Sequence, residues 1–366
     1  MNLPPAFLLA NYLLATQLCA QSWVSQTSGS TASLRGVNAV NSKVVWASGA
    51  GGSYLHTADG GVTWTAATVS GAEALDFRGV RAINALTVYL VASGSGDKAR
   101  VYRTSDGGGH WTLQFTNPDA QGFFDAIAFW DASHGIILGD PVDGQFAIWT
   151  TGDGGVHWQR QHTPPAVPNE GAFAASNSCL FLMGKQEAWF GTGGPGGARV
   201  FHSQDRGRSW TVAATPIRND AASAGIFSLA FADARHGIAV GGDYAKDPDE
   251  IGNIAITEDG GRTWTAPAGP VPKGFRSSVV HVRERQIWLA AGTSGSDVST
   301  DLGRTWKPFD QASFNAMSFA GRAGWAVGAR GRIAAFRWDS GRQDSSHPRP
   351  RGREIPFRPG AIIPAP

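Results

Sequence analysis

Three arginines stand where the chain is expected to begin equivalent strands, each directly after an apolar residue. They are Arg35 in Leu34-Arg35-Gly36, Arg78 in Phe77-Arg78-Gly79 and Arg276 in Phe275-Arg276-Ser277. A guanidinium group is planar and presents a fork of N–H donors that matches a carboxylate or a phosphate. Three such groups gathered in one hollow would recognise an anionic ligand. The alternative is that each arginine pairs with an acid, such as Asp125 or Glu170, and only stiffens the fold.

Acidic side chains and a tyrosine accompany these arginines in long connections. Residues 139–144 and 241–252 bring Asp140, Asp243 and Tyr244, while Glu170 precedes another expected strand and a Gly-rich connection covers 191–197. A basic centre with an acidic rim is typical of a ligand-binding mouth, and plain solvated turns are the alternative. The carboxylates in 243–250 suit calcium, but their spacing is not that of an EF-hand, and we predict no metal site.

The elements that position these residues follow from a motif that occurs six times. Its pattern is (Ser/Thr)-x-Asp-x-Gly-x-x-Trp, and successive copies lie 42 to 54 residues apart. Its aspartates are Asp59, Asp106, Asp153, Asp205, Asp259 and Asp301. A turn signature that recurs between β-rich runs at this period is typical of propeller blades.

The motif is interpreted as scaffold rather than as chemistry. Each copy is flanked by strand-like runs and therefore closes a hairpin. The Asp carboxylate can accept hydrogen bonds from N–H groups of its own turn, and the following Gly permits positive φ. The Trp supplies a large apolar surface that can fill the space between neighbouring blades. We therefore predict that the six aspartates are structural and that none is catalytic.

The number of blades follows from the second strand of each repeat. Seven runs end in small residues, from Val44–Gly49 to Gly324–Gly328, which is one more than the number of Asp motifs. The last unit supplies only three strands, and Ser22-Trp23-Val24 matches the fourth strands of the other units. The sequence predicts an all-β, seven-bladed propeller of four-stranded antiparallel blades over residues 21–338, closed by pairing the N-terminal strand with the last blade.

The repeated motif resembles the Asp-box (bacterial neuraminidase) repeat, and the Leu/Phe-Arg-Gly strand openings resemble the photosystem II stability/assembly factor family of propellers. In that family, arginines at this strand position form a basic patch that contacts a client protein. Arg35, Arg78 and Arg276 match the position, and the other four blades depart from it. The resemblance to sialidases implies instead an arginine triad that grips a sugar carboxylate, with Tyr244 the one tyrosine placed to act as nucleophile.

The two ends of the chain differ in composition from the propeller. Residues 1–20 read as a signal peptide, with an uncleaved anchor as the alternative, so we expect a periplasmic or secreted protein. Residues 339–366 are Pro- and Arg-rich and read as a disordered tail, for which a weak contact with an anionic membrane surface is the alternative to a merely solvated end. After cleavage Cys179 would be the only cysteine, and its surroundings indicate a buried core residue.

The sequence favours an exported, non-catalytic binding propeller that acts as an assembly or stability factor. It would hold a protein segment or an anionic ligand on its arginine face, and we expect a monomer. A sialidase-like glycoside hydrolase is the alternative. The formal net charge of +2 gives no indication of nucleic-acid binding. Redox chemistry lacks any sequence fingerprint, and we predict no cofactor.

Overall fold

Seven small antiparallel sheets make up nearly all the regular structure of the computed structural model, which describes residues 21–338. The signal peptide and the tail predicted from the sequence lie outside these residues. Within residues 21–338, no helix has the length and the apolar run needed to cross a membrane. The only helical segments that these residues form as named elements are three short 3-10 turns, η1 (Gly96–Lys98), η2 (Tyr244–Lys246) and η3 (Arg283–Arg285).

Each sheet is one blade, formed by strands that follow one another in the chain. Blade one contains β2 (Leu34–Ala39), β3 (Val45–Gly49), β4 (Ser53–Thr57) and β5 (Thr65–Thr68), and blade two contains β6 (Phe77–Ala82), β7 (Val88–Ala92), β8 (Arg100–Thr104) and β9 (Thr112–Thr116). Blade three contains β10 (Phe124–Phe129), β11 (Gly135–Val142), β12 (Gln145–Thr151) and β13 (Gln159–Arg160). Blade four contains β14 (Leu180–Met183), β15 (Glu187–Gly191), β16 (Arg199–Ser203) and β17 (Thr211–Ala214). Blade five contains β18 (Ala224–Phe231), β19 (Gly237–Asp243) and β20 (Ile254–Thr257). Blade six contains β21 (Ser278–Val282), β22 (Ile287–Gly292), β23 (Gly295–Ser299) and β24 (Lys307–Asp310). Blade seven contains β25 (Ala316–Ala320), β26 (Ala323–Val327), β27 (Ile333–Arg337) and β1 (Ser22–Gln26).

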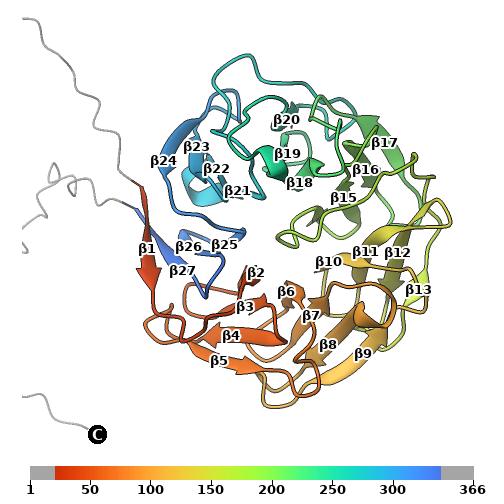
Figure 1. The fold of residues 1–366 in the computed structure, drawn as a ribbon, viewed down its shortest axis with the longest axis vertical. Helices are drawn as coiled ribbons and strands as arrows, with labels where there is room; N and C mark the ends of the chain where they lie inside the picture. The colour runs from red at the N-terminus through yellow and green to blue at the C-terminus, as the bar shows by residue number, and fades with distance from the viewer. Residues whose placement is uncertain (1–20, 339–366) are drawn as a thin grey trace, which may run out of the picture. The chain divides into compact units, whose positions relative to one another are not determined.

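The blades surround a central axis, and the first strand of each lies innermost, as Figure 1 shows. Side chains on the inner strands join one blade to the next. The Asn38 carboxamide oxygen accepts a hydrogen bond from the Ala82 N–H at 2.8 Å, and the Ser318 hydroxyl accepts one from the Ala39 N–H at 3.0 Å. Backbone groups that face the axis are thereby paired, as buried N–H groups require. The predicted seven-bladed propeller is confirmed.

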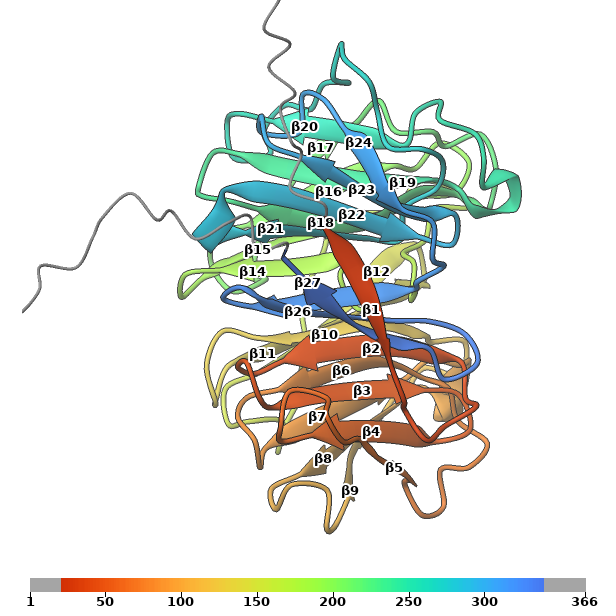
Figure 2. The same cartoon turned by 90° about the vertical axis from the view of Figure 1, so that its left-hand side faces the viewer.

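The ring closes by pairing the first strand with the last of the described chain. Strand β1 runs antiparallel to β27, with Ser22 opposite Arg337 and Gln26 opposite Ile333, and Figure 2 shows the two strands side by side. The Trp23 ring packs edge-on against Phe336 at 4.8 Å between centroids. The pairing therefore covers the edge of β27 that would otherwise be left without a partner strand.

Blade five departs from the four-stranded prediction. Its sheet contains three strands, and the segment after its Asp motif makes only an isolated bridge between Ile256 and Thr265. The Trp264 side chain is nevertheless buried against the neighbouring blade. The Trp contact therefore holds this turn in place without a full fourth strand.

The second strands form the core between blades. Strands β3, β7 and β22 are buried along their whole length, because they lie in the middle of a sheet that is covered on both faces. Between blades one and two, Trp46 packs with Phe77 and Tyr102 in one apolar cluster. Each large side chain buried in this way stabilises the fold by roughly 2–3 kcal/mol.

Blade four differs from the others because the residues before its inner strand fold across the axis. Residues 173–178, here named the plug, precede β14. The Asn177 side chain forms a pair of hydrogen bonds with the backbone of Ile127 in blade three, at 2.8 and 3.0 Å. The Ser176 hydroxyl donates to the Ser277 carbonyl in blade six at 2.7 Å. The plug thus joins opposite sides of the central channel.

Candidate functional site

The candidate site lies where the inner strands begin, and bulges aim its side chains. The pairing of β2, β6, β10 and β18 with the second strand shifts by one residue near the start, which leaves one extra residue in each inner strand. The extra residues are Arg35, Arg78, Asp125 and Phe227. A bulge commonly re-aims a side chain in this way.

A hollow of about 370 Å³, here named the mouth, opens at this end of the channel. Arg35 and Arg78 line one side of it, as predicted from the sequence. Its lining also includes four aromatic side chains, here named the aromatic wall: Phe173, Phe227, Tyr244 and Phe275. Cationic and aromatic side chains thus line one opening.

The aromatic wall is a packed cluster rather than four separate rings. Phe173 from the plug stacks on Phe227 with centroids 3.8 Å apart, and Phe275 meets Phe227 edge-on at 4.7 Å. Tyr244, which is 56% exposed, contacts both Phe227 and Phe275 at the rim. Rings held in this way offer a rigid apolar surface to a ligand.

Arg35 is the more weakly compensated cation of the mouth. Burial lowers the pKa of its guanidinium, the charge of Arg78 lowers it further, and the charge of Asp76 acts in the opposite direction. Its Nε has no hydrogen-bond partner, and no carboxylate in residues 21–338 lies within ion-pairing distance of it. Arg78, in contrast, pairs with Asp76 at 2.8 Å. The mouth therefore has one cation, Arg35, that forms no ion pair within residues 21–338.

Arg276 does not reach the mouth, which corrects the prediction that three arginines gather there. The N–H groups of Leu34, Ile226, Arg276 and Phe314 share one role, since each donates to a carbonyl at the end of the preceding blade's second strand. All four side chains are buried. Arg276 therefore occupies the position of Leu34, and Ser277 occupies that of Arg35. The sequence alignment was wrong by one residue in blade six.

The buried guanidinium of Arg276 is fully paired. Its Nε and Nη2 reach Asp297 at 2.7 and 2.6 Å, and its other donors go to Ser294 and to two backbone carbonyls. Asp297 is also completely buried. Burial raises the pKa of its carboxyl, and the charge of Arg276 opposes that rise. This pair is structural.

Asp125 lies beneath the mouth rather than in it. Its side chain is completely buried, and neither oxygen forms a hydrogen bond of ordinary geometry. The Ala174 N–H is nevertheless near enough to lower the pKa of the Asp125 carboxyl. Burial raises the pKa of Asp125 well above its usual range, and the charge of Asp140 raises it further, while Arg78 acts in the opposite direction. Burial therefore favours the protonated form of Asp125, and no ion pair joins it to Arg35 or Arg78.

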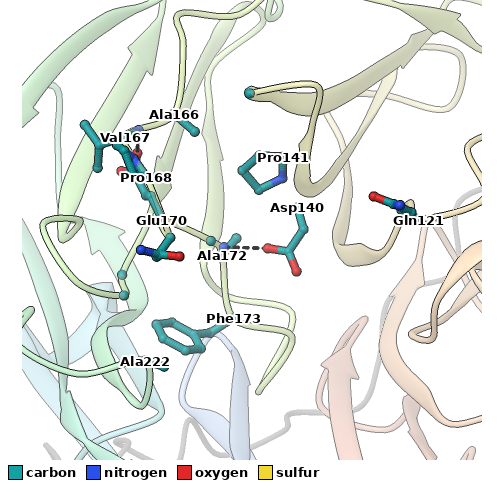
Figure 3. A pocket seen from close by; sticks show the side chains of 15 residues that line it. Gln121, Asp140, Pro141, Ala166, Val167, Pro168, Glu170, Ala172, Phe173 and Ala222 are labelled. Carbon is teal, nitrogen blue, oxygen red and sulfur yellow. Dashed lines mark hydrogen bonds between the residues drawn. The ribbon is translucent and has the colours of Figure 1, made fainter.

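A second hollow, here named the groove, adjoins the mouth and has a volume of about 840 Å³. Phe173 lines both, and Figure 3 shows it below Asp140 and Glu170. Asp140 accepts a hydrogen bond from the Ala172 N–H at 2.9 Å, and burial raises its pKa. Glu170 is buried and engaged by Arg199, Thr192 and the Val167 N–H. Glu170 thus holds the groove wall in place.

The acids of residues 243–250 are engaged by neighbours. Asp243 accepts from the Ala245 N–H at the start of η2, Asp247 accepts from Thr293, Asp249 pairs with Arg218 and Glu250 pairs with Lys273. Across residues 21–338 no group of three or more His, Cys, Asp or Glu side chains is placed to hold a metal ion. Tyr244 is the first residue of η2 and follows Asp243, which caps this turn.

The six Asp motifs share one hydrogen-bond pattern. In each, the Ser or Thr hydroxyl donates to the Asp carboxylate and accepts from the N–H of the Gly four residues on, at 2.8 to 3.0 Å. The same carboxylate accepts from the N–H two residues after that Gly, as Asp59 does from Thr63. The Thr63 hydroxyl and N–H hold the pKa of Asp59 far below its usual range. These contacts are internal to the turns, so the aspartates have the scaffold role that the motif predicts.

Sequence reasoning missed the aromatic wall and the plug. Phe227 aligns with the arginines of blades one and two, and Phe275 directly precedes Arg276, which are the signals by which the two rings could have been found. Phe173 lies in a Pro- and Gly-rich stretch with no strand pattern, and nothing in the sequence marks it as crossing the channel.

Solved structures with this architecture include both a binding protein and an enzyme. YCF48 bound to D1 peptide is 17% identical to this chain, with a TM-score of 0.62 over 88% of this chain and 98% of that one. YCF48 from Cyanidioschyzon merolae is 16% identical, with a TM-score of 0.59 over 87% and 98%. The GH74 enzyme of Niastella koreensis is 15% identical, with a TM-score of 0.58 over 85% of this chain and 53% of that one.

These similarities show the fold. The resemblance noted in the sequence is confirmed at that level. No protein-family model matches the chain, and no curated protein matches it.

Proposed function

We propose that this chain is a non-catalytic binding propeller that holds an extended segment of a partner protein across the mouth. A carboxylate of the partner would pair with Arg35 and Arg78, and an apolar side chain of the same segment would lie on the aromatic wall. The observation that carries the proposal is the partly buried guanidinium of Arg35, which has no counter-ion among the described residues.

The chemistry of the mouth suits this ligand. A cation removed from water and repelled by a neighbouring cation gains more from an incoming carboxylate than a solvated arginine does. The groove continues from the mouth past Phe173, so a segment several residues long has room to lie across both. The similar structure of YCF48, which is bound to D1 peptide, supports a peptide ligand for a propeller of this form.

The geometry favours binding over sialidase-like catalysis. The third arginine that such a reaction needs, Arg276, is occupied by Asp297. Tyr244 contacts the rings of Phe227 and Phe275. We further propose that the protein is exported and acts as an assembly or stability factor for its client. Fractionation of the producing cell tests the export, since a protein found only in the cytoplasm would refute it.

The binding experiment uses two fluorescein-labelled peptides that differ only in charge. One alternates Asp and Leu over eight residues, and the other has Asn in place of every Asp. Fluorescence anisotropy should show saturable binding of the Asp peptide and at least tenfold weaker binding of the Asn peptide. The Arg35→Gln variant should lose about tenfold or more in affinity for the Asp peptide, because a charge-assisted hydrogen bond is worth about 1.5–3 kcal/mol.

Two controls separate the site from general charge effects. Arg235→Gln removes a positive charge from the exposed turn between β18 and β19, at the opposite end of the inner strands, and should leave peptide affinity unchanged. Phe227→Ala should weaken both peptides equally, since it removes apolar surface only. Equal affinity of the native protein and Arg35→Gln for the Asp peptide would rule out the proposal.

A further inference from the structure

The other end of the central channel has a cavity of its own. Its volume is about 610 Å³, and its lining comes from the ends of the inner strands, such as Phe129, Met183, Phe231 and Phe319. The mouth is lined from the starts of the same strands. The plug residues Ser176, Asn177 and Ser178 form its inner boundary. This cavity, here named the lower chamber, is thus distinct from the mouth.

Every ionisable side chain that lines the lower chamber is basic. These side chains are Arg81, Arg283 and His281, and the lining includes no Asp or Glu. Burial lowers the pKa of His281, so this ring is neutral at pH 7 and the charge comes from the arginines. Two arginines within one cavity raise the local potential and concentrate anions there.

Arg81 is the side chain that most requires a ligand. Its Nη2 donates to the Phe129 carbonyl at 3.1 Å, while its Nε has no hydrogen-bond partner. Arg81 forms no ion pair with any carboxylate in residues 21–338. Burial also lowers its pKa. A charge held away from water without a counter-ion is costly, and an anion in the chamber would relieve that cost.

The rest of the lining is largely apolar. Phenylalanine, methionine, leucine and valine side chains surround the arginines, and the polar Asn38, Asn177 and Ser318 are already engaged in holding neighbouring blades together. The volume lies in the range of small-molecule sites, which are mostly apolar with a few convergent polar groups. An ion without an apolar body would leave most of this surface in contact with water.

We propose that the lower chamber binds a small amphipathic anion, an aromatic or aliphatic molecule with one carboxylate, sulfonate or phosphate group. The anionic group pairs with Arg81 and Arg283, and the apolar body fills the space between the phenylalanine and methionine side chains. Because the plug separates the chamber from the mouth, this site and the protein-segment site are occupied independently.

The test compares two dyes with related aromatic bodies, 8-anilinonaphthalene-1-sulfonate and the uncharged N-phenyl-1-naphthylamine. The native protein should bind the sulfonate saturably with a 1:1 ratio, measured by fluorescence and by calorimetry. Arg81→Gln should weaken the sulfonate about tenfold or more and leave the uncharged dye unchanged. A crystal grown with the sulfonate should show it beside Arg81.

Further variants keep the proposal falsifiable. Val280→Trp fills the chamber without changing charge and should abolish binding of both dyes, while Arg304→Gln, an exposed change distant from the chamber lining, should have no effect. Melting curves identify any variant that fails to fold, and in that case the crystal of the native protein decides. Equal sulfonate affinity for the native protein and Arg81→Gln, loss of affinity in Arg35→Gln instead, or sulfonate density at the mouth would overturn the proposal.

Discussion

The six Asp turns and the seven inner-strand starts are both repeated features, yet they differ in how far the repetition extends. Every Asp turn uses the same residue types and the same hydrogen bonds, and its polar groups are paired within the turn. The strand starts share a backbone position but present Arg35, Phe227, Ser277 and Asn315 to one opening. Uniform repeats stabilise the ring, and the position that varies from blade to blade lines the proposed binding site.

The same contrast separates two arginines at neighbouring register positions. Arg276 stands at the buried position that Leu34 has in blade one, and all its N–H donors form hydrogen bonds. Arg35 stands one position later in blade one, where its charge has no partner in the described chain. The sequence around the two residues is similar, but one step of register separates a cation that lines the mouth from an internal ion pair.

The largest expected loss of stability follows from removing the buried ion pair of Arg276. Arg276→Ala leaves the carboxylate of Asp297 buried without its counter-ion and should lower the free energy of unfolding by about 3–5 kcal/mol. Urea denaturation measures the loss. The double variant Arg276→Leu with Asp297→Val should recover most of it, whereas Arg35→Ala should cost under about 0.5 kcal/mol. Similar losses for Arg276→Ala and Arg35→Ala would remove the distinction drawn above.

A second prediction tests whether the Asp turns are equivalent. Ser299→Ala removes a buried hydroxyl and leaves the Gly303 N–H without its acceptor, at a cost of about 1–3 kcal/mol. Thr57→Val and Thr104→Val should cost similar amounts, because the geometry is the same. Melting temperatures compare the three. A lower melting temperature in only one of the three variants would mean that the Asp turns do not contribute equally to the stability of the ring.

The turns also predict a dependence on acid. The pKa values of Asp59 and Asp106 lie below their usual range because the turn's own donors, Thr63 and His110, favour the charged form. Their stabilisation is therefore present above the pKa of an unfolded Asp and is lost as the pH falls through the lower folded-state pKa.

The last prediction concerns Asp125, whose contribution to stability depends on pH with the opposite sign. Its folded-state pKa is raised by burial and by Asp140, so the folded chain keeps a proton that the unfolded chain loses near pH 4. Its contribution to stability then falls as the pH rises toward the folded-state pKa, by at most about 1.4 kcal/mol per pH unit. Asp125→Asn cannot ionise, so its stability relative to the native protein should increase between pH 5 and pH 8 in urea denaturation. A constant difference across that range would contradict the shift.

The fold could be predicted because its signals are local and repeated. The Asp motif fixes a turn by contacts within eight residues, and the count of small-residue endings gave the seventh blade. Ring closure followed from the match of Ser22-Trp23-Val24 to the other fourth strands. Each of these inferences uses a pattern that the sequence presents several times.

The site could be predicted only in part, because its details depend on single exceptions to the repeat. In blade six the apolar-Arg pair lies one residue earlier than in blades one and two, because Ser278 pairs with Ala291 as Gly36 pairs with Ser48, and alignment on that pair placed Arg276 one position late. The plug has no counterpart in other blades. Asp125 is buried because Ala174 and its neighbours cover it. The pattern of apolar residues in the sequence does not predict this contact.

The pairing of β1 with β27 has a consequence for how the molecule is made. Ser22 and Arg337 are partners in one sheet, so a nascent chain can assemble six blades in order but must wait for its final strand before the first can dock. Contacts this distant along the chain form slowly and leave an unpaired edge until they do. Strand β1 therefore has no partner strand from its own synthesis until β27 has been made.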